Sequence, residues 1–182
     1  MVAQMQERIE DALSDWPALA HQVLKTLRVS QVAYVPDAGH RKLIELCQAD
    51  PSMRAIPLTT EEEGVGLAAG AWLGGERAVL LMQSSGVGNC PNTLAMMKSC
   101  GFPFLTLVTM RGDWGEFNPW QLPMGQTTAA TLELAGCAVY RAETPDAVAP
   151  ALEAASRLAF DAGAMAAVLI AQKLIGTKSF KD

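Results

Sequence analysis

Short apolar runs alternate with helical segments along the whole chain, and this alternation restricts the fold more than any other feature. The runs lie at residues 31–35, 53–58, 78–83, 103–110, 137–141 and 164–171. Because each run is mostly apolar at consecutive positions, rather than at every second position, it indicates a strand buried on both faces. Strands separated by helices are typically parallel. The sequence therefore predicts an α/β fold with an open, doubly wound, mainly parallel sheet of about six strands.

Helical segments are expected at residues 4–27, 39–49, 61–73, 126–135 and 145–160, and another ends near Lys98. Trp16 and Pro17 mark a break in the first of them. Asp37 is a candidate cap for the second, and Thr59 or Thr60 for the third, where Glu63 completes a capping-box pattern. We expect one domain over residues 1–182, with 1–17 as an N-terminal helical extension.

Composition excludes several classes of protein. Apolar residues make up 50% of the chain and charged residues 18%, which excludes disorder and suggests surface buried against a partner. The net charge of −5, without a Lys/Arg cluster, argues against nucleic-acid binding. No apolar run is long enough to span a bilayer, and no signal peptide is recognisable, so a cytoplasmic protein is expected. The cysteines and histidines are too dispersed for a metal site, and we interpret the cysteines as reduced, small hydrophobic residues (Cys47, Cys90, Cys100, Cys137, His21, His40).

The unusual residues gather in four loops, at 36–40, 59–64, 83–89 and 111–126. Each loop follows a predicted strand. Ligands of open α/β sheets usually bind beyond the carboxyl ends of the strands. These four loops therefore form the candidate site.

The segment TTEEEGVGLAAGAWLGG places three glutamates at the start of a helix built from small residues. Acids in a first helical turn are often no more than favourable helix-dipole partners. The run of Gly and Ala behind them, however, predicts that something packs closely against the helix. The pattern Glu-x-x-x-x-Gly-x-Ala-x-Gly followed by an aromatic resembles the pyrimidine-binding domain of thiamine-diphosphate enzymes. In that family the leading glutamate lies nine residues before the closing glycine, which here is Gly70 and selects Glu61.

This resemblance implies a catalytic role for Glu61, which would hydrogen-bond N1′ of the cofactor's aminopyrimidine and favour removal of the thiazolium C2 proton. The segment QSSGVGN resembles the loop beside the aminopyrimidine, especially in phosphonopyruvate and sulfopyruvate decarboxylases. It implies a cofactor and substrate neighbourhood of Gln83, Ser85, Gly86 and Asn89. The alternative is an ordinary tight strand-to-helix turn. No Walker A lysine follows the glycines, which excludes a nucleotide P-loop.

The segment VPDAGHRKLIE resembles the family's first strand-to-helix loop, which implies that Pro36 lies beside the cofactor and that His40 is a catalytic and substrate-binding residue. The alternative for His40 is a solvated surface residue. The long loop MRGDWGEFNPWQLPMGQTT resembles a sulfopyruvate decarboxylase alpha-subunit segment, which implies that Arg111, Gln121 or Gln126 reaches an anionic substrate tail. The alternative for Arg111 is an ion pair with Asp113 or Glu116.

The family's Gly-Asp-Gly … Asn motif, which holds Mg²⁺ and the diphosphate, does not occur in the sequence. The resemblance covers about residues 18–175 and only the pyrimidine half of such enzymes. It implies the alpha subunit of a split thiamine-diphosphate-dependent 2-oxoacid decarboxylase, which shares the cofactor with a beta subunit that binds Mg²⁺. Sulfopyruvate is the expected substrate, and another small anionic 2-oxoacid such as phosphonopyruvate is the alternative. The alternative outside the enzymes is a non-catalytic pyrimidine domain that only binds partner proteins.

Overall fold

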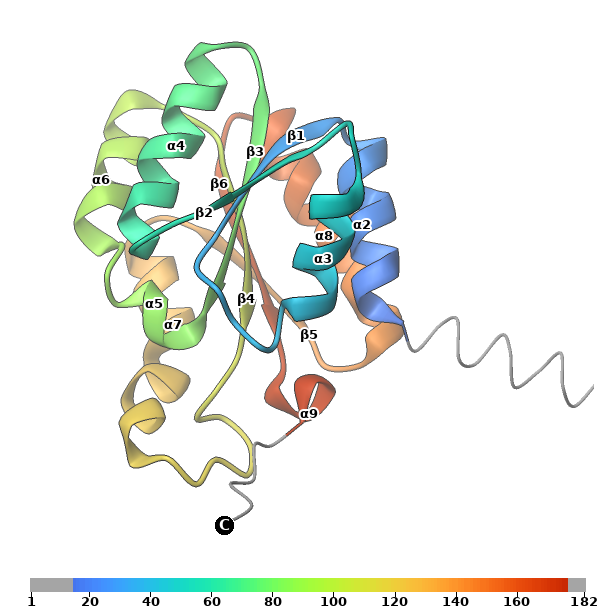
Figure 1. Cartoon of the computed structure of the whole chain (residues 1–182). Coiled ribbons are helices and arrows are strands. Elements are labelled where there is room, and N and C mark those ends of the chain that lie inside the picture. The colour runs from blue at the N-terminus through green and yellow to red at the C-terminus, as the bar shows by residue number, and fades with distance from the viewer. Residues whose placement is uncertain (1–14, 177–182) are drawn as a thin grey trace, which may run out of the picture.

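The structure, a computed structural model, describes residues 15–176 and contains a single six-stranded sheet between two layers of helices (Figure 1). The strands are β1 (Val29–Tyr34), β2 (Arg54–Pro57), β3 (Arg77–Gln83), β4 (Phe104–Thr109), β5 (Ala138–Ala142) and β6 (Met165–Ile170). The helices are α2 (Trp16–Thr26), α3 (Arg41–Ala49), α4 (Glu61–Leu73), α5 (Ser84–Val87), α6 (Pro91–Cys100), η1 (Pro119–Gln121), α7 (Leu122–Leu134), α8 (Pro145–Phe160) and α9 (Gln172–Ile175). The strand order is β2-β1-β3-β4-β6-β5, and every pairing is parallel. The predicted fold class is confirmed.

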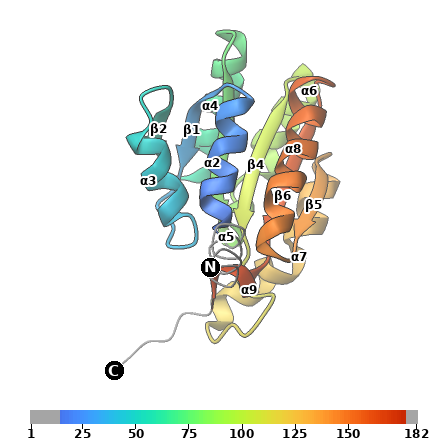
Figure 2. The ribbon, with the colours of Figure 1, turned by 90° about the vertical axis from the view of Figure 1, so that its right-hand side faces the viewer.

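The middle of the sheet is buried on both faces because β3, β4 and β6 are mostly apolar at consecutive positions, whereas the edge strands β2 and β5 are mostly half-buried or exposed. In β3, Val79 and Leu81 pack into one core with α2, α3 and α8, whereas Leu80 and Met82 pack into a second core with α4, α6 and α7. Figure 2, seen from the side of α2, α3 and α8, shows the sheet behind these helices. The rows of apolar side chains on the two faces therefore hold each helix in a fixed place relative to the strand ends.

The predicted strands are all present, with their ends displaced by one or two residues. Two local predictions were wrong. Residues 84–87, expected as loop, form the short helix α5, and α7 begins at Leu122 rather than at residue 126. Of the predicted N-terminal helix, α2 confirms the part from Trp16, and residues 1–14 of the predicted extension lie outside the described residues.

The caps of α3 and α4 also differ from the predictions. Asp37 does not cap α3, which begins after His40 without a side-chain cap. Thr60 is the N-cap residue of α4, but its side chain makes no capping bond. The Glu63 carboxylate instead accepts a hydrogen bond from the Thr59 N–H at 2.8 Å, so half of a capping-box arrangement is formed one residue early.

All four candidate loops follow the carboxyl ends of strands, and the loops at 83–89 and 111–126 lie toward the bottom of Figure 1. β1 and β3 are neighbours in the sheet. The connection from β1 leads to β2 on one side of this pair, and the connection from β3 leads to β4 on the other side. The carboxyl ends of β1 and β3 therefore lie at a topological switch point, where open α/β sheets form a crevice for a ligand.

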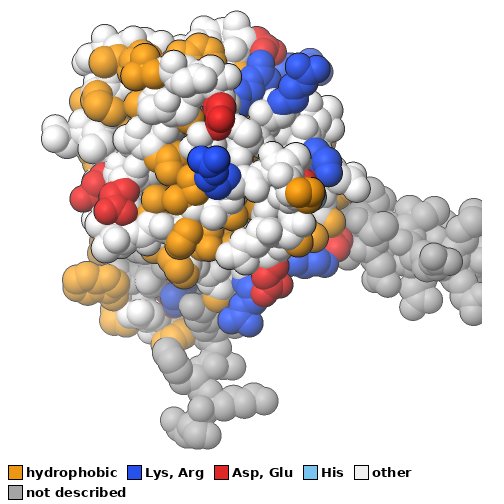
Figure 3. All heavy atoms as spheres, turned by 45° about the horizontal axis from the view of Figure 1, so that its top comes forward, with side chains coloured by type: hydrophobic (Ala, Val, Ile, Leu, Met, Phe, Trp, Pro, Cys, Tyr) orange, Lys and Arg blue, Asp and Glu red, His pale blue; other side chains and the backbone are white. Residues whose placement is uncertain are grey.

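Helix α4 has a packed face and an open face. A Cβ atom at Gly64 would lie 2.4 Å from Leu80 Cδ1, whereas Cβ atoms at Gly66 and Gly70 would meet no atom within 4 Å. The predicted close packing on α4 is therefore confirmed for Gly64 but is absent at Gly66 and Gly70 within residues 15–176. Hydrophobic side chains gather on the side of α4 and α6, while Lys and Arg lie mostly on the opposite side of the same view (Figure 3). Within the described range, no helix is long and apolar enough to cross a membrane.

Candidate active site at the carboxyl ends of the strands

Glu61 is the first residue of α4, and its side chain is largely buried, with the residue 9% exposed. The Asn89 side-chain amide donates a hydrogen bond of 2.7 Å to Glu61 Oε2. Among the described residues, no hydrogen bond is made to Oε1. The carboxylate is thus fixed by one oxygen, in the field of the helix N-terminus, while the other retains its capacity to accept or share a proton.

The glycine of α5 makes room for this carboxylate. A Cβ atom at Gly86 would lie 2.3 Å from Glu61 Oε1 and 2.4 Å from Cδ, so either it or the Glu61 side chain would have to shift. The Gly86 position therefore has to remain without a side chain if Glu61 is to occupy its place. The structure thus brings Glu61, Gly86 and Asn89 into contact, and their role in binding a cofactor stays a prediction.

A second group of polar side chains surrounds Asp37, directly after β1. Its Oδ1 accepts a hydrogen bond from Gln83 Nε2 at 2.9 Å, and its Oδ2 accepts one from the Thr109 hydroxyl at 2.5 Å. Burial by itself raises the pKa of Asp37, but the neighbouring His40 imidazole, the Thr109 hydroxyl and the Gly39 N–H outweigh it. Together they hold the pKa of this carboxyl well below its usual range, so Asp37 is ionised at neutral pH.

His40 lies beside Asp37 in the protein interior, without exposure to solvent. The side chain is 0% exposed, its Nδ1 is 3.5 Å from Asp37 Oδ2, and its ring meets that of Trp16 edge to face. Neither ring nitrogen makes an aligned hydrogen bond. The alternative of a solvated surface histidine is therefore wrong, because the ring is fully buried and Trp16 of α2 packs against it. Direct contact between His40 and a substrate stays a prediction.

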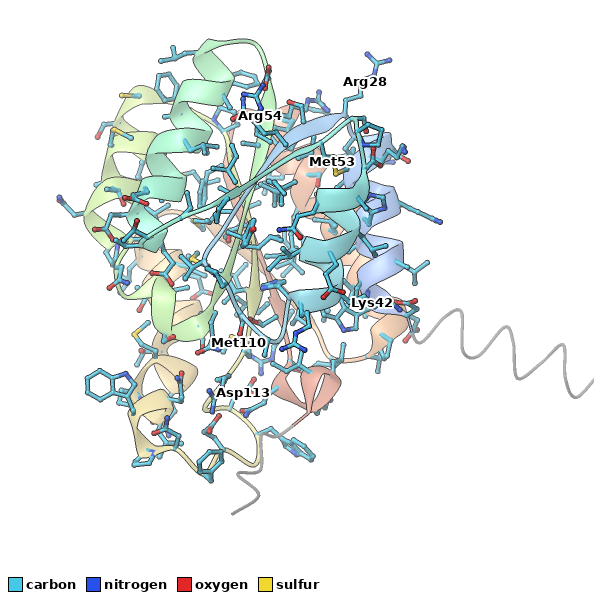
Figure 4. All side chains as sticks on the ribbon, viewed as in Figure 1. Arg28, Lys42, Met53, Arg54, Met110 and Asp113 are labelled. Carbon is cyan, nitrogen blue, oxygen red and sulfur yellow. The ribbon has the colours of Figure 1, made fainter. Side chains whose placement is uncertain are left out.

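The loop after β4 is held in one conformation by buried polar contacts. Arg111 donates two hydrogen bonds to the Glu116 carboxylate, Nε at 2.8 Å and Nη2 at 2.6 Å, and the two side chains are 10% and 1% exposed. Hydrogen bonding to Arg111, opposed by burial, lowers the pKa of Glu116 to about 2. The ion-pair alternative for Arg111 is thus confirmed for Glu116. Asp113, whose side chain Figure 4 places in this loop, pairs with Arg141 instead.

Gln172, at the start of α9, joins the same loop from the opposite direction. Its Oε1 accepts hydrogen bonds from the Gly112 and Trp114 N–H groups at 2.9 and 3.2 Å, and its Nε2 donates to Glu116 at 2.8 Å. The Ser84 hydroxyl further binds the backbone of Arg111. These contacts tie the ends of β3, β4 and β6 together, so the loop presents its aromatic residues from a rigid base.

A cavity of about 610 Å³ opens between α5 and the start of α7. It is lined by Ser85, Trp120 and Met124 together with Asn118, Pro119 and Pro123. Its wall is thus mostly apolar, with Ser85 and Asn118 as its polar residues, as is usual for small-molecule sites.

Among the described residues that were predicted for the site, Ser85 alone lines this cavity. Gln121 is buried, and its Oε1 has no hydrogen-bond partner among the described residues. Gln126 is exposed on α7. Pro36 lines a separate cavity of about 270 Å³ beside Asp37 and Arg41. The roles assigned to these three residues stay predictions.

Sequence reasoning missed Gln172, Thr109, Ser84 and the network role of Asp37. The available signal was positional, because Thr109 ends a strand and the others directly follow or soon follow one. Polar residues at that place in a parallel sheet are candidates for a site, whatever their residue type.

Comparisons with known proteins agree with this arrangement. No protein-family model matches the sequence. The chain is 35% identical over 127 residues to the sulfopyruvate decarboxylase subunit alpha of Methanocaldococcus jannaschii, a match that spans 69% of this chain and 75% of that protein. The chain belongs to the family of sulfopyruvate decarboxylase alpha subunits. The expectation of a decarboxylase subunit is confirmed at this level.

Two further comparisons involve longer proteins. Phosphonopyruvate decarboxylase of Streptomyces viridochromogenes is 37% identical over 113 residues, which are 61% of this chain and 28% of that protein. The 2-oxoglutarate:ferredoxin oxidoreductase of Magnetococcus marinus superposes on 88% of this chain with a TM-score of 0.73, over 29% of its own length. Because its sequence identity is 13%, the latter comparison supports the fold alone.

Proposed function

We propose that the chain is the alpha subunit of a thiamine-diphosphate-dependent 2-oxoacid decarboxylase that converts sulfopyruvate to sulfoacetaldehyde and CO₂. A beta subunit would bind the diphosphate and Mg²⁺. The observation that carries the proposal is the placement of Glu61, whose carboxylate is anchored by Asn89 and lies over the bare backbone of Gly86. The relative named as a sulfopyruvate decarboxylase alpha subunit supports the choice of substrate.

The residues around Glu61 fit an aminopyrimidine. Oε1 has no hydrogen bond from the described residues, so it can share a proton with a ring nitrogen such as N1′. Asn89 keeps the carboxylate in place while this proton is shared. Thiamine diphosphate, when bound, supplies the electron sink into which the carbon–carbon bond electrons pass as CO₂ leaves. The protein's part is to orient the ring and hold the proton at Glu61.

The other predicted residues take supporting positions in this proposal. Gln83, Ser85, Gly86 and Asn89 would face the cofactor. His40 would act through Asp37, because its ring is fully buried beside that carboxylate.

Arg111, Gln121 and Gln126 remain the candidates for the anionic substrate tail. The bidentate pair with Glu116 already occupies two donors of Arg111. A substrate would therefore have to share this guanidinium or displace Glu116 from it, and displacement of a buried partner is costly.

The need for a beta subunit is supported by two observations. The relative from Methanocaldococcus jannaschii is named as a subunit, and α4 leaves an open face at Gly66 and Gly70 beside exposed hydrophobic residues. Small residues of this kind allow close approach of a second polypeptide. We further propose that the complex is cytoplasmic, which the four free cysteines support.

The test is reconstitution. The chain should be purified alone and together with a candidate beta subunit that carries a Gly-Asp-Gly … Asn motif. Each preparation is then assayed with thiamine diphosphate and Mg²⁺ on sulfopyruvate, phosphonopyruvate and pyruvate. We expect no decarboxylation by the chain alone and the highest kcat/KM of the complex for sulfopyruvate. Preference for phosphonopyruvate would favour the second candidate, to which the 37% identical relative points. Robust activity of the chain alone would contradict the split-site proposal, and a complex inactive on all three would favour a non-catalytic domain.

A further inference from the structure

A chain of hydrogen bonds runs from the buried Asp37 carboxylate to the wall of the 610 Å³ cavity. Gln83 Nε2 donates to Asp37 Oδ1 at 2.9 Å, and the Ser85 hydroxyl donates to Gln83 Oε1 at 3.1 Å. Thr109 fixes the other oxygen of Asp37, and Gly39 packs so closely that a Cβ there would lie 2.9 Å from it. The start of this chain of contacts is therefore rigid.

The direction of every hydrogen bond in this chain follows from the charge on Asp37. An ionised carboxylate accepts hydrogen bonds and cannot donate one, so the Gln83 side chain must turn its NH₂ group toward Asp37. Its carbonyl oxygen then faces Ser85 and requires a donor. The proton of the Ser85 hydroxyl is thereby committed to Gln83.

We infer that Asp37 is a positioning residue that fixes, through Gln83, the hydrogen-bond polarity of Ser85. With its proton engaged, Ser85 offers the cavity only lone pairs, so the ligand group that meets it must be a hydrogen-bond donor. A ligand acceptor at this point would face a second acceptor, and one of the two would lose its hydrogen bond.

This hydrogen-bond polarity distinguishes between the two small molecules of the proposed function, the sulfopyruvate substrate and thiamine diphosphate. The assignment of Ser85 to one of them therefore rests on the proposed function. A sulfopyruvate anion carries carboxylate, keto and sulfonate oxygens, all of which are acceptors. The aminopyrimidine of thiamine carries an exocyclic amino group, which donates. Ser85 therefore belongs to the cofactor side of the site and recognises the 4′-amino group.

The substitution Asp37→Asn inverts the chain of hydrogen bonds with almost no change of shape. The new amide would keep its oxygen toward Thr109 and turn its NH₂ group toward Gln83. Gln83 would then rotate to accept that bond, donate to Ser85, and leave the Ser85 proton free to point into the cavity. Thr109→Val is the matched control, because it removes one contact of Asp37 and leaves the bond to Gln83 in place.

The first measurement is the dissociation constants of thiamine diphosphate and of its 4′-oxo analogue, oxythiamine diphosphate, for the reconstituted complex by calorimetry. We expect the parent and Thr109→Val to prefer thiamine diphosphate by about tenfold, and Asp37→Asn to lose or reverse that preference. An unchanged ratio of the two constants in Asp37→Asn would overturn the inference and leave the proposed function intact.

A second measurement detects the hydrogen-bond chain from Asp37 through Gln83 to Ser85 without any ligand. In the ¹⁵N-labelled chain, the side-chain NH₂ resonances of Gln83, assigned by their loss in Gln83→Leu, should lie downfield in the parent and in Thr109→Val because they donate to a carboxylate. They should move upfield in Asp37→Asn. Resonances that do not move would overturn the inference. If this shift occurs but the complex binds neither thiamine diphosphate nor oxythiamine diphosphate, the proposed function is contradicted, whereas the hydrogen-bond chain from Asp37 to Ser85 is supported.

Discussion

Replacement of Gly86 by alanine tests the geometry around Glu61 by adding a single methyl group. The new Cβ would lie 2.3–2.5 Å from three atoms of the Glu61 side chain, well inside van der Waals contact. Either the carboxylate or α5 must move by about 1 Å, and the 2.7 Å hydrogen bond from Asn89 cannot be retained in its present geometry. Overpacking of this kind costs about 1–3 kcal/mol of folding free energy.

Urea unfolding of the isolated chain, followed by tryptophan fluorescence, measures this cost. Gly88→Ala is the matched control in the same segment, because its Cβ would be 3.4 Å from Met124 Sδ, an ordinary contact. In the reconstituted complex, displacement of a catalytic carboxylate by about 1 Å should lower kcat about 100-fold for Gly86→Ala. If Gly86→Ala is as stable as Gly88→Ala and retains parental turnover, the contact between Gly86 and Glu61 does not exist as described.

Two other predictions concern the rest of the chain. The pKa of Glu116 is lowered to about 2 by Arg111, so its contribution to stability is complete above its ordinary value of 4.5 and is lost as the pH falls toward 2. Glu116→Gln should therefore destabilise the chain by about 3 kcal/mol at pH 7 and flatten the acid limb of the unfolding free energy; an unchanged acid limb would contradict this. Burial raises the pKa of the Cys47, Cys90 and Cys137 thiols to about 12, while Cys100 is exposed. A thiol reagent should react rapidly with Cys100 in the native chain and with the others only after unfolding, and rapid reaction of a second thiol would contradict the packing.

The central strands were predictable from the sequence because they are mostly apolar at consecutive positions, and burial on both faces is the condition that selects such runs. β4 and β6 illustrate this, since every residue in both strands is buried. The start of α4 was predictable for a similar reason, because Thr60 and the acids after it form a local signal.

The short helix α5 was not predictable, because Ser and Gly have low helix propensity and its position depends on distant contacts. Ser84 is held by the backbone of Arg111, which is remote in sequence. The burial of His40 similarly depends on Trp16 of α2, which no pattern near residue 40 reveals.

In the candidate site, too, local features were predictable from the sequence and long-range contacts were not. The spacing of Glu61 from Gly70 is local and could be read directly. The bond between Gln172 and Gly112 joins residues that come together only when β4 and β6 pair. All four cysteines are free, as the sequence predicts; Cys47, Cys90 and Cys137 are buried, whereas Cys100 ends α6 at the surface.

Substitution of Glu61 by glutamine is the most direct test of the central claim that this carboxylate activates the cofactor. Glu63→Gln is the matched control, since Glu63 lies in the same helical turn but is exposed. In the reconstituted complex with thiamine diphosphate and Mg²⁺, Glu61→Gln should retain subunit assembly and substrate binding but lower kcat about 100-fold or more, whereas Glu63→Gln should turn over near the parental rate. Near-parental kcat in Glu61→Gln would contradict the assignment of Glu61 and the proposed site that depends on it.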